Sequence, residues 1–131
     1  MDLTEQAKEV LSKDKGFIAS NNYSVLKLEE NYCEMEGTIT ESSFNAYGIV
    51  HGGYLFGLAD TTGGLAARAR GSNAVTINAN IDYLKVCRDN KVKAVAKCLK
   101  NGKTIAVYEV FLYDLSDNLI AKASFSYFYV N

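Results

Sequence analysis

A chain of 131 residues, 48% of them apolar and 22% charged, is long enough to bury one core, and we expect a single domain spanning residues 1–131. The formal net charge of −1 gives no basic excess for binding nucleic acid or an anionic membrane. The first residues are polar and acidic, and no stretch approaches the roughly 20 apolar residues of a membrane span. We therefore expect a cytoplasmic protein with neither nucleic-acid nor membrane partners.

The predicted elements begin with an amphipathic helix over residues 3–13. Asp2 or Thr4 is placed to cap its first turn, and Gly16 is placed to end it. Two stretches rich in β-branched and aromatic residues follow, and they predict a hairpin over 22–30 and 32–40.

Residues 41–50 predict a loop and residues 52–69 a long helix, after which every segment has the pattern of a strand. The strands are expected over 75–83, 91–100, 103–115 and 119–130. The dipeptide Asn101-Gly102 predicts a tight turn between the second and third strands. Residues 116–118 predict the turn that follows.

Apolar and polar residues alternate in the first of these strands, which predicts one buried face and one exposed face. The apolar positions are Val75, Ile77, Ala79, Ile81 and Tyr83. Thr76 belongs to the opposite, polar set. In the last strand, Phe125, Tyr127 and Tyr129 are expected to share one face.

One central helix cannot cover both faces of a sheet of about six strands. The order of elements instead fits an α+β fold, in which a curved antiparallel sheet wraps around one long central helix. The edges of the sheet and its remaining apolar face would then need a partner chain.

The three cysteines, Cys33, Cys87 and Cys98, are odd in number and have no CxxC spacing. They predict neither a disulfide framework nor a zinc site. Because the chain has a single histidine, His51, we expect no metal centre.

The predicted central helix is unusually rich in glycine. Gly57, Gly63 and Gly64 lie in its interior, where each costs about 1 kcal/mol relative to alanine, or about 3 kcal/mol together. A helix that tolerates this cost is expected to let a sheet or a ligand approach its backbone closely.

Asp60 is the only charged residue between positions 52 and 67, and it lies off the apolar stripe of the helix. Its own face also lacks the lysines and glutamates of a solvated surface, since it holds Phe56, Gly57, Gly64 and Ala67. Burying an unpaired carboxylate there would be costly. Asp60 therefore either faces solvent, accepts hydrogen bonds from hydroxyls such as that of Thr76, or has a function.

His51, Gly52 and Gly53 stand at the expected start of the same helix, where free backbone N–H groups could stabilise a developing oxyanion. The alternative is that His51 hydrogen-bonds the helix end while the glycines permit tight packing. Asp60 lies nine residues after His51, which is about 13.5 Å along a helix axis and about 180° around it. If both residues act on one substrate, they must come from different subunits.

Together these residues form a longer motif, which reads Asn45-x-x-Gly48-x-x-His51-Gly52-Gly53 followed by Leu58-Ala59-Asp60. This motif resembles the signature of hotdog-fold acyl-CoA thioesterases of the PaaI-like, phenylacetate-degradation group, and the likeness covers nearly the whole chain. The resemblance implies hydrolysis of an acyl-CoA to free acid and coenzyme A, without a metal or redox cofactor.

The resemblance also implies roles for individual residues. Asp60 would act as general base or nucleophile, and Thr76 would help to hold the attacking water. The N–H of Gly52 would polarise the thioester carbonyl. Asn45 would position the carbonyl or the substrate, and His51 would support that loop or the leaving-group side.

The same resemblance implies a homodimer with active sites at the subunit interface, and dimers that often pair into tetramers. Asn45, His51 and Gly52 would come from one subunit, and Asp60 and Thr76 from the other. Gly53 is implied as a second N–H donor or substrate contact.

Five further residues are candidates for binding the substrate. Tyr54 and Phe56 are candidates for the acyl pocket, although core packing is the favoured role for either residue alone. Lys85, Arg88 and Lys103 fall near strand ends where the family meets CoA phosphates, although ordinary surface charge would explain them too. The sequence leaves aromatic and medium-chain acyl groups open.

Two other functions fit the same fold. One is a non-catalytic acyl-CoA binding or sensor protein, and the other is a hydratase or dehydratase acting on an enoyl or 3-hydroxyacyl thioester. The intact set of Asn45, His51, Asp60 and Thr76 argues against a pure binding protein, and the context of Asp60 fits a thioesterase better than a hydratase.

Overall fold

The computed structural model describes residues 1–130, which begin with helix α1 (Leu3–Ser12). The carboxylate of Asp2 accepts the backbone N–H of Glu5 at 2.9 Å and so caps the first turn. This confirms Asp2 as the cap, because its side chain satisfies one of the N–H groups that a helix start leaves unpaired. Thr4 lies inside the helix instead, and its hydroxyl donates to the carbonyl of Leu28.

The prediction that Gly16 ends α1 is wrong. The helix stops at Ser12, and Gly16 is the N-cap of a second helix, α2 (Phe17–Ser20). The Asp14 carboxylate accepts the N–H groups of Gly16 and Ala19, which stabilises this turn. A helix of four residues is too short to have a hydrophobic period, so the sequence did not reveal it.

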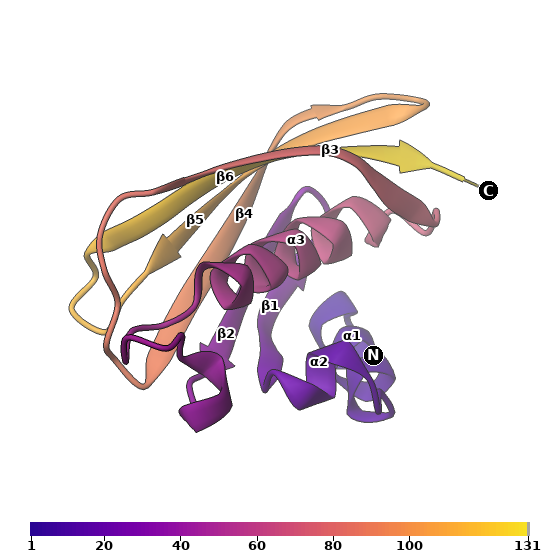
Figure 1. Ribbon diagram of the computed structural model, residues 1–131. Coiled ribbons are helices and arrows are strands. Elements are labelled where there is room, and N and C mark those ends of the chain that lie inside the picture. The colour runs from indigo at the N-terminus through magenta and orange to yellow at the C-terminus, as the bar shows by residue number, and fades with distance from the viewer. Residues whose placement is uncertain (131) are drawn as a thin grey trace.

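Six antiparallel strands form one curved sheet, as predicted, in the order β1-β2-β4-β5-β6-β3 (Figure 1). The strands are β1 (Tyr23–Glu29), β2 (Tyr32–Thr38), β3 (Ala74–Tyr83), β4 (Lys91–Asn101), β5 (Ile105–Tyr113) and β6 (Leu119–Tyr129). The two edges of the sheet are therefore β1 and β3.

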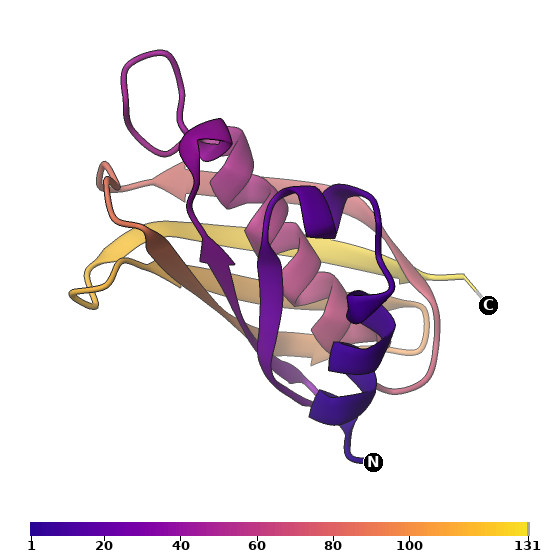
Figure 2. The ribbon, with the colours of Figure 1, turned by 90° about the horizontal axis from the view of Figure 1, so that it is seen from below.

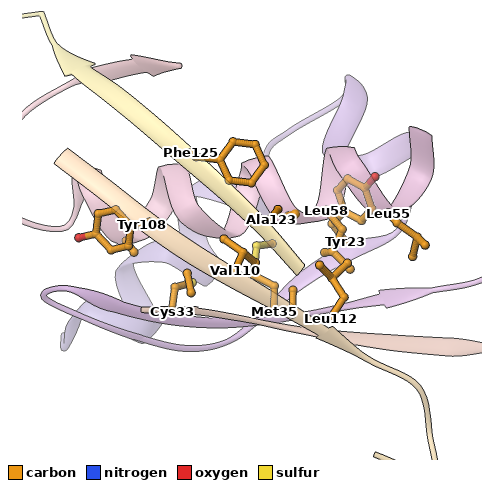
Figure 3. Packing of buried hydrophobic residues seen from close by; sticks show 14 of the residues in the cluster. Tyr23, Cys33, Met35, Leu55, Leu58, Tyr108, Val110, Leu112, Ala123 and Phe125 are labelled. Carbon is orange, nitrogen blue, oxygen red and sulfur yellow. The ribbon is translucent and has the colours of Figure 1, made fainter. Parts of the chain in front are cut away.

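The long helix α3 (Gly52–Arg68) lies along the concave side of the sheet and contacts all six strands (Figures 1 and 2). This confirms the predicted α+β architecture. Leu58 of α3 is fully buried among residues of the strands, including Met35, Val110 and Ala123 (Figure 3). The helix α1 packs beside it against β1. No helix among residues 1–130 is long and apolar enough to cross a membrane.

The glycines of α3 do allow close approach, as predicted. At Gly57 an added Cβ would lie 2.7 Å from the Tyr23 hydroxyl and 2.8 Å from the Phe17 ring. At Gly63 an added Cβ would collide with the Tyr127 hydroxyl. The cost of these glycines in the helix is offset by the aromatic residues that pack directly on its backbone.

The turn between β4 and β5 is longer than the two-residue turn predicted from Asn101-Gly102. Asn101 pairs with Ala106, and the Gly102 N–H donates to the Ile105 carbonyl at 2.9 Å. The Arg70 guanidinium donates to the side chain of Asn101 and to backbone carbonyls of the turn. This long-range contact stabilises a wider turn than the dipeptide alone would choose.

The predicted burial of β3 is correct for Ala79 and Ile81 and wrong for the positions before the bulge. Val75 and Ile77 are 45% and 53% exposed, whereas Ala79 and Ile81 pack against the core. The register with β6 shifts between Thr76 and Asn78, which marks a β-bulge. Because a bulge inserts one extra residue, it reverses which side chains face the helix on its two sides. Thr76 therefore faces α3 together with Ala79 and Ile81.

Candidate active site

The carboxylate of Asp60 lies in the middle of α3 and is partly exposed. Its Oδ1 accepts a hydrogen bond from the Thr76 hydroxyl at 2.7 Å. The Tyr127 hydroxyl lies 3.3 Å from the same Oδ1 and 3.0 Å from the backbone carbonyl oxygen of Asp60. Thr76 and Tyr127 therefore both bind Oδ1, and among residues 1–130 no donor binds Oδ2.

The contact with Thr76 depends on the bulge in β3. Without it, the strict alternation of the strand would put Thr76 on the face opposite Ala79 and Ile81. The interpretation of Asp60 as a carboxylate bonded by Thr76 is therefore confirmed geometrically, and this geometry is also the one that orients a catalytic carboxylate.

Sequence analysis missed Tyr127 as a neighbour of Asp60. It is fully buried, and desolvation together with the negative charge of Asp60 raises its pKa well above the ordinary tyrosine range. It therefore stays protonated and acts only as a donor toward Asp60. The sequence signalled only that Tyr127 faces the core, because its position relative to α3 depends on strand pairing far along the chain.

The start of α3 is held by His51, the N-cap residue. Its Nδ1 accepts the N–H of Gly53 at 2.7 Å, and its own backbone N–H donates to the Ser43 carbonyl at 2.8 Å. An accepting Nδ1 implies a neutral ring with the proton on Nε2. The expectation that Gly53 offers a second N–H to the substrate is therefore wrong, because His51 already binds that N–H.

Gly52 is left as the donor at the helix start. Its carbonyl accepts a hydrogen bond from the Tyr83 hydroxyl at 2.8 Å, and an added Cβ would lie 3.1 Å from the Tyr83 ring. Tyr83 comes from the end of β3, so this contact ties the helix start to the same strand that carries Thr76. The sequence pattern had marked Tyr83 only as an apolar strand position.

Asn45 shapes the loop that precedes the helix. Its side-chain carbonyl accepts the N–H groups of Tyr47 and Ile49 at 2.8 and 3.3 Å. Such a contact fixes the turn locally, as asparagine commonly does. Phe44 and Val50 then close the loop through an isolated β-bridge, so the predicted loop over residues 41–50 has a defined shape.

A cleft of about 270 Å³ opens beside the start of α3. Its walls are mostly apolar, and its lining includes Asn45, Gly52, Leu55, Tyr83 and Lys85. The structure therefore brings the predicted Asn45, Gly52 and Lys85 to one cavity, next to the backbone donor of the helix. Among residues 1–130, no cluster of three His, Cys, Asp or Glu side chains could hold a metal ion.

Asp60 does not reach this cleft within one chain. The helix runs without interruption from Gly52 to Arg68, so Asp60 stands eight residues, or about 12 Å, further along its axis than Gly52. The continuous helix therefore keeps the Asp60 carboxylate and the Gly52 N–H apart in a single subunit.

The two candidate acyl-pocket residues differ. Tyr54 is 5% exposed, its hydroxyl donates to the Asn21 carbonyl at 2.7 Å, and its ring packs on Tyr23 at 5.1 Å. The structure therefore packs Tyr54 in the core, and its small exposed surface lines a second pocket together with His51 and Gly53, away from the cleft beside Gly52. Phe56 is partly buried against the Phe125 ring, at 5.5 Å between ring centroids, and keeps some exposed surface.

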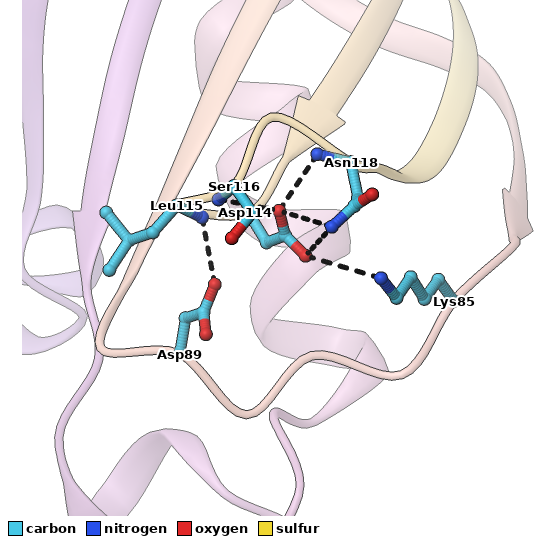
Figure 4. Close-up of polar contacts among 6 residues, drawn as sticks. All are labelled: Lys85, Asp89, Asp114, Leu115, Ser116 and Asn118. Atoms are coloured by element: carbon cyan, nitrogen blue, oxygen red, sulfur yellow. Dashed lines mark hydrogen bonds and ion pairs between the residues drawn. The ribbon is translucent and has the colours of Figure 1, made fainter.

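The three basic candidates do not cluster in one chain. Lys85 and Arg88 lie in the loop between β3 and β4, where the Lys85 ammonium is 3.9 Å from the Asp114 carboxylate (Figure 4). Lys103 lies in the β4–β5 turn, and the 11 residues of β4 separate the two loops by about 33 Å. Hydrogen bonds from Asn118 hold the pKa of Asp114 below its usual range, so it stays charged beside Lys85.

Comparisons with known proteins agree with this fold and motif. A family model described as the thioesterase superfamily matches residues 47–121, more than half of the chain, and the chain therefore belongs to that superfamily. The acyl-coenzyme A thioesterase PaaI of Escherichia coli K12 is 28% identical over 98 residues, which is 74% of this chain and 70% of that protein.

Two solved structures show the same fold. The PaaI protein from the phenylacetic acid degradation operon of E. coli has a TM-score of 0.91 at 22% identity, over 98% of this chain and 94% of that one. A hypothetical thioesterase of Streptococcus pneumoniae TIGR4, solved with coenzyme A, has a TM-score of 0.83 at 30% identity, over 88% of this chain and 91% of that one. The predicted hotdog fold and PaaI-like relationship are confirmed.

Proposed function

We propose that this protein is an acyl-CoA thioesterase in which Asp60 is the catalytic carboxylate. The observation that carries this proposal is the 2.7 Å hydrogen bond from Thr76 to Oδ1 of Asp60, on the only charged residue of α3 before Arg68. Membership of the thioesterase superfamily supplies the reaction class.

The chemistry follows from the two kinds of group at the site. The free Oδ2 of Asp60 takes a proton from water as general base, or attacks the carbonyl carbon itself to give a mixed anhydride that water then hydrolyses. In either case a carbon–oxygen bond forms, the carbon–sulfur bond breaks, and coenzyme A leaves as a thiolate that is then protonated. The N–H of Gly52 stabilises the oxyanion that develops on the carbonyl oxygen.

A homodimer completes this site, and the free edge strand β3 supports it. β3 pairs with β6 along one edge, and its other edge pairs with no strand among residues 1–130. It also exposes Val75 and Ile77. A long apolar edge of this kind favours pairing with another chain. A two-fold axis beside β3 would set two α3 helices antiparallel, so that Gly52 of one subunit approaches Asp60 of the other. Pairing of such dimers into tetramers remains a prediction.

The substrate assignment is to acyl-CoA with an aryl or medium-chain acyl group. Lys85 lines the cleft beside Gly52 and supplies a cation for a phosphate, with Arg88 exposed in the same loop. Phe56 is the remaining aromatic candidate for the acyl pocket. The coenzyme A bound to the S. pneumoniae relative and the similarity to the acyl-coenzyme A thioesterase PaaI of E. coli support this class of substrate.

The test is a thiol-release assay over aryl-acyl and aliphatic acyl-CoA substrates, with the Asp60→Asn variant alongside. Wild-type protein should release coenzyme A from at least one of them, and D60N should lose at least about a thousandfold in kcat, as expected when the group that activates the nucleophile is removed. Asp117→Asn is the matched control, because it removes an exposed carboxylate at a turn position with φ of 62°, which asparagine tolerates.

Other outcomes separate the alternatives. Saturable coenzyme A binding without turnover on the whole panel would favour an acyl-CoA binding protein. A change in enoyl absorbance with a crotonyl thioester would favour a hydratase. Full activity in D60N would remove Asp60 from the mechanism, and an active monomer in light scattering would contradict the shared site.

A further inference from the structure

Tyr127 contacts the proposed catalytic carboxylate from beneath. Its hydroxyl has two acceptors within reach, the backbone oxygen of Asp60 at 3.0 Å and the carboxylate Oδ1 at 3.3 Å. A phenol has one proton, so this proton is shared between the two oxygens of one residue. Its position follows the charge of Asp60, because an ionised oxygen accepts a hydrogen bond more strongly than a neutral one.

The helix is built to admit this hydroxyl. An added Cβ at Gly63 would collide with the Tyr127 oxygen, so any larger residue at position 63 would displace it. The ring itself is fully buried between Tyr108 and Phe125, and it would pack there without its hydroxyl. The glycine therefore makes room chiefly for the hydroxyl, since the nearest ring carbons would lie 3.2 and 3.3 Å from the added Cβ.

Other tyrosines donate to α3 in a different way. Tyr129 lies on the same strand and face as Tyr127, and its hydroxyl donates to the Ala67 carbonyl of α3 at 3.1 Å. Tyr23 donates to the Tyr54 carbonyl at 2.6 Å. The Tyr129 hydroxyl also lies 3.0 Å from Oδ1 of Asn101, which is a neutral amide, whereas the side chain that Tyr127 reaches is ionisable.

We propose that Tyr127 is a positioning residue for hydrolysis, which with Thr76 fixes Oδ1 of Asp60 and so presents Oδ2 to the water or thioester. This inference rests on the proposed thioesterase function. Two donors on one oxygen stop the carboxylate from rotating about its Cβ–Cγ bond, and orientation of this kind matters in the transition state more than in substrate binding. When Asp60 accepts a proton on Oδ2, the Tyr127 hydroxyl is free to donate to the backbone carbonyl instead.

The test compares Tyr127→Phe with Tyr129→Phe by steady-state kinetics on the best acyl-CoA substrate. Y127F should lower kcat about five- to tenfold while KM stays within about twofold, since the lost contact acts on the reacting group and not on bound substrate. Y129F removes a hydroxyl that comes from the same strand, β6, and donates to the same helix, α3. It should leave kcat and KM unchanged. Equal losses in the two variants, or a kcat for Y127F within twofold of wild type, would overturn the proposal.

A double-mutant cycle with Asp60→Asn separates positioning from packing. If Tyr127 acts through the carboxylate, adding Y127F to D60N should not lower the residual rate further. If it serves packing alone, the two losses should multiply. Should wild-type protein release no thiol at all, the proposed function fails; should wild type be active and the losses multiply, only the role of Tyr127 fails.

Gly63→Ala provides a second route that keeps the tyrosine. The new methyl group should push the hydroxyl away from Asp60 and lower kcat at least as much as Y127F does. Adding Y127F to G63A removes the colliding oxygen, so the double variant should melt at a higher temperature than G63A alone. A lower melting temperature in the double variant, or an unchanged kcat in G63A, would contradict the close approach on which the proposal depends.

Discussion

The middle and the start of α3 hold their functional groups by different means. In the middle, Asp60 is held by hydroxyls from two strands, Thr76 of β3 and Tyr127 of β6. At the start, the group proposed to meet the substrate is the backbone N–H of Gly52, which lies between the His51 cap and the Tyr83 hydroxyl. The position of the Asp60 carboxylate therefore depends on how the strands pair, whereas that of the Gly52 N–H depends mainly on residues close to it in the sequence.

The difference follows from the kind of group at each place, a side-chain carboxylate in the middle and a backbone N–H at the start. A carboxylate can rotate, so it needs donors that fix it, and those donors must come from other elements. A backbone N–H is already fixed by the helix, so it needs only to be left free of other acceptors. The His51 ring accepts the N–H of Gly53 and leaves that of Gly52 without an acceptor among residues 1–130, as the proposed role requires.

The first prediction tests the start of the helix with Gly52→Pro against Gly52→Ala. Both variants add a Cβ near the Tyr83 ring, but only proline removes the N–H. Proline suits the first helical position, and His51 already has the extended conformation, φ −64° and ψ 136°, that a residue before proline needs. We expect kcat for G52P to fall at least about a hundredfold below that of G52A, the usual effect of removing an oxyanion donor.

Steady-state kinetics of the two variants, with circular dichroism to establish folding, checks this prediction. If G52P and G52A lose the same activity, the added Cβ is responsible and the N–H of Gly52 has no part in the reaction. The N–H at Nε2 of His51 would then be the next candidate for the oxyanion donor at the helix start.

The second prediction tests whether the two halves of a site come from different subunits. D60N and G52P chains should each be nearly inactive alone. After random subunit exchange, about a quarter of the sites should combine an intact Asp60 from one chain with an intact Gly52 from another, which gives about a quarter of wild-type activity. The measurement is thiol release before and after mixing under conditions that allow exchange.

A mixture that stays inactive although light scattering and tandem-tag purification confirm mixed oligomers would place both halves in one subunit. That result would contradict the spacing argument, since it would require the helix to bend or break between Gly52 and Asp60. Each variant mixed with itself is the control.

The start of the helix was largely predictable from the sequence, and the middle only in part, since the bond from Thr76 to Asp60 was among the expected alternatives but that from Tyr127 was not. The stretch from Asn45 to Gly53 identified a helix start and its free N–H groups, because capping and turn formation depend on neighbours within a few residues. The predicted limits of α3 were correct to within one residue at its end. The hydrogen bond from the N–H of Gly53 to His51 confirms the alternative in which His51 caps the helix end.

The surroundings of Asp60 depend on contacts that a sequence pattern does not record. Strict alternation put Thr76 on the wrong face of β3, because a bulge leaves no signal in the order of apolar and polar residues. Tyr127 lies 67 positions away and reaches Asp60 through the pairing of β3 with β6. The glycine at position 63 was the available signal, since it predicted that another group lies close to the helix backbone but did not identify Tyr127 as that group.

The last and smallest effect concerns pH and compares the tyrosines beneath the two halves. Burial raises the pKa of Tyr54, beneath the helix start, to about 12, and raises that of Tyr127 further. The pKa of each tyrosine is higher in the folded protein than the value of about 10 in the unfolded chain. Its contribution to the free energy of unfolding is therefore complete below pH 10 and is lost as the pH rises through the folded pKa. The free energy of unfolding should therefore fall above pH 10, by at most about 1.4 kcal/mol per pH unit for each such tyrosine.

Urea unfolding between pH 8 and 12 measures this fall in wild type, Tyr54→Phe and Y127F, since the midpoint reports the free energy at each pH. Each variant lacks one buried hydroxyl that can ionise, so each should lose stability less steeply above pH 10 than wild type. The two should separate near pH 12, where Tyr54 in Y127F begins to ionise in the folded state and its curve flattens, whereas Tyr127 in Y54F stays neutral and keeps its slope. Parallel curves for all three proteins would mean that neither tyrosine determines how the free energy of unfolding falls at alkaline pH. Ionisation of other groups would then cause the fall.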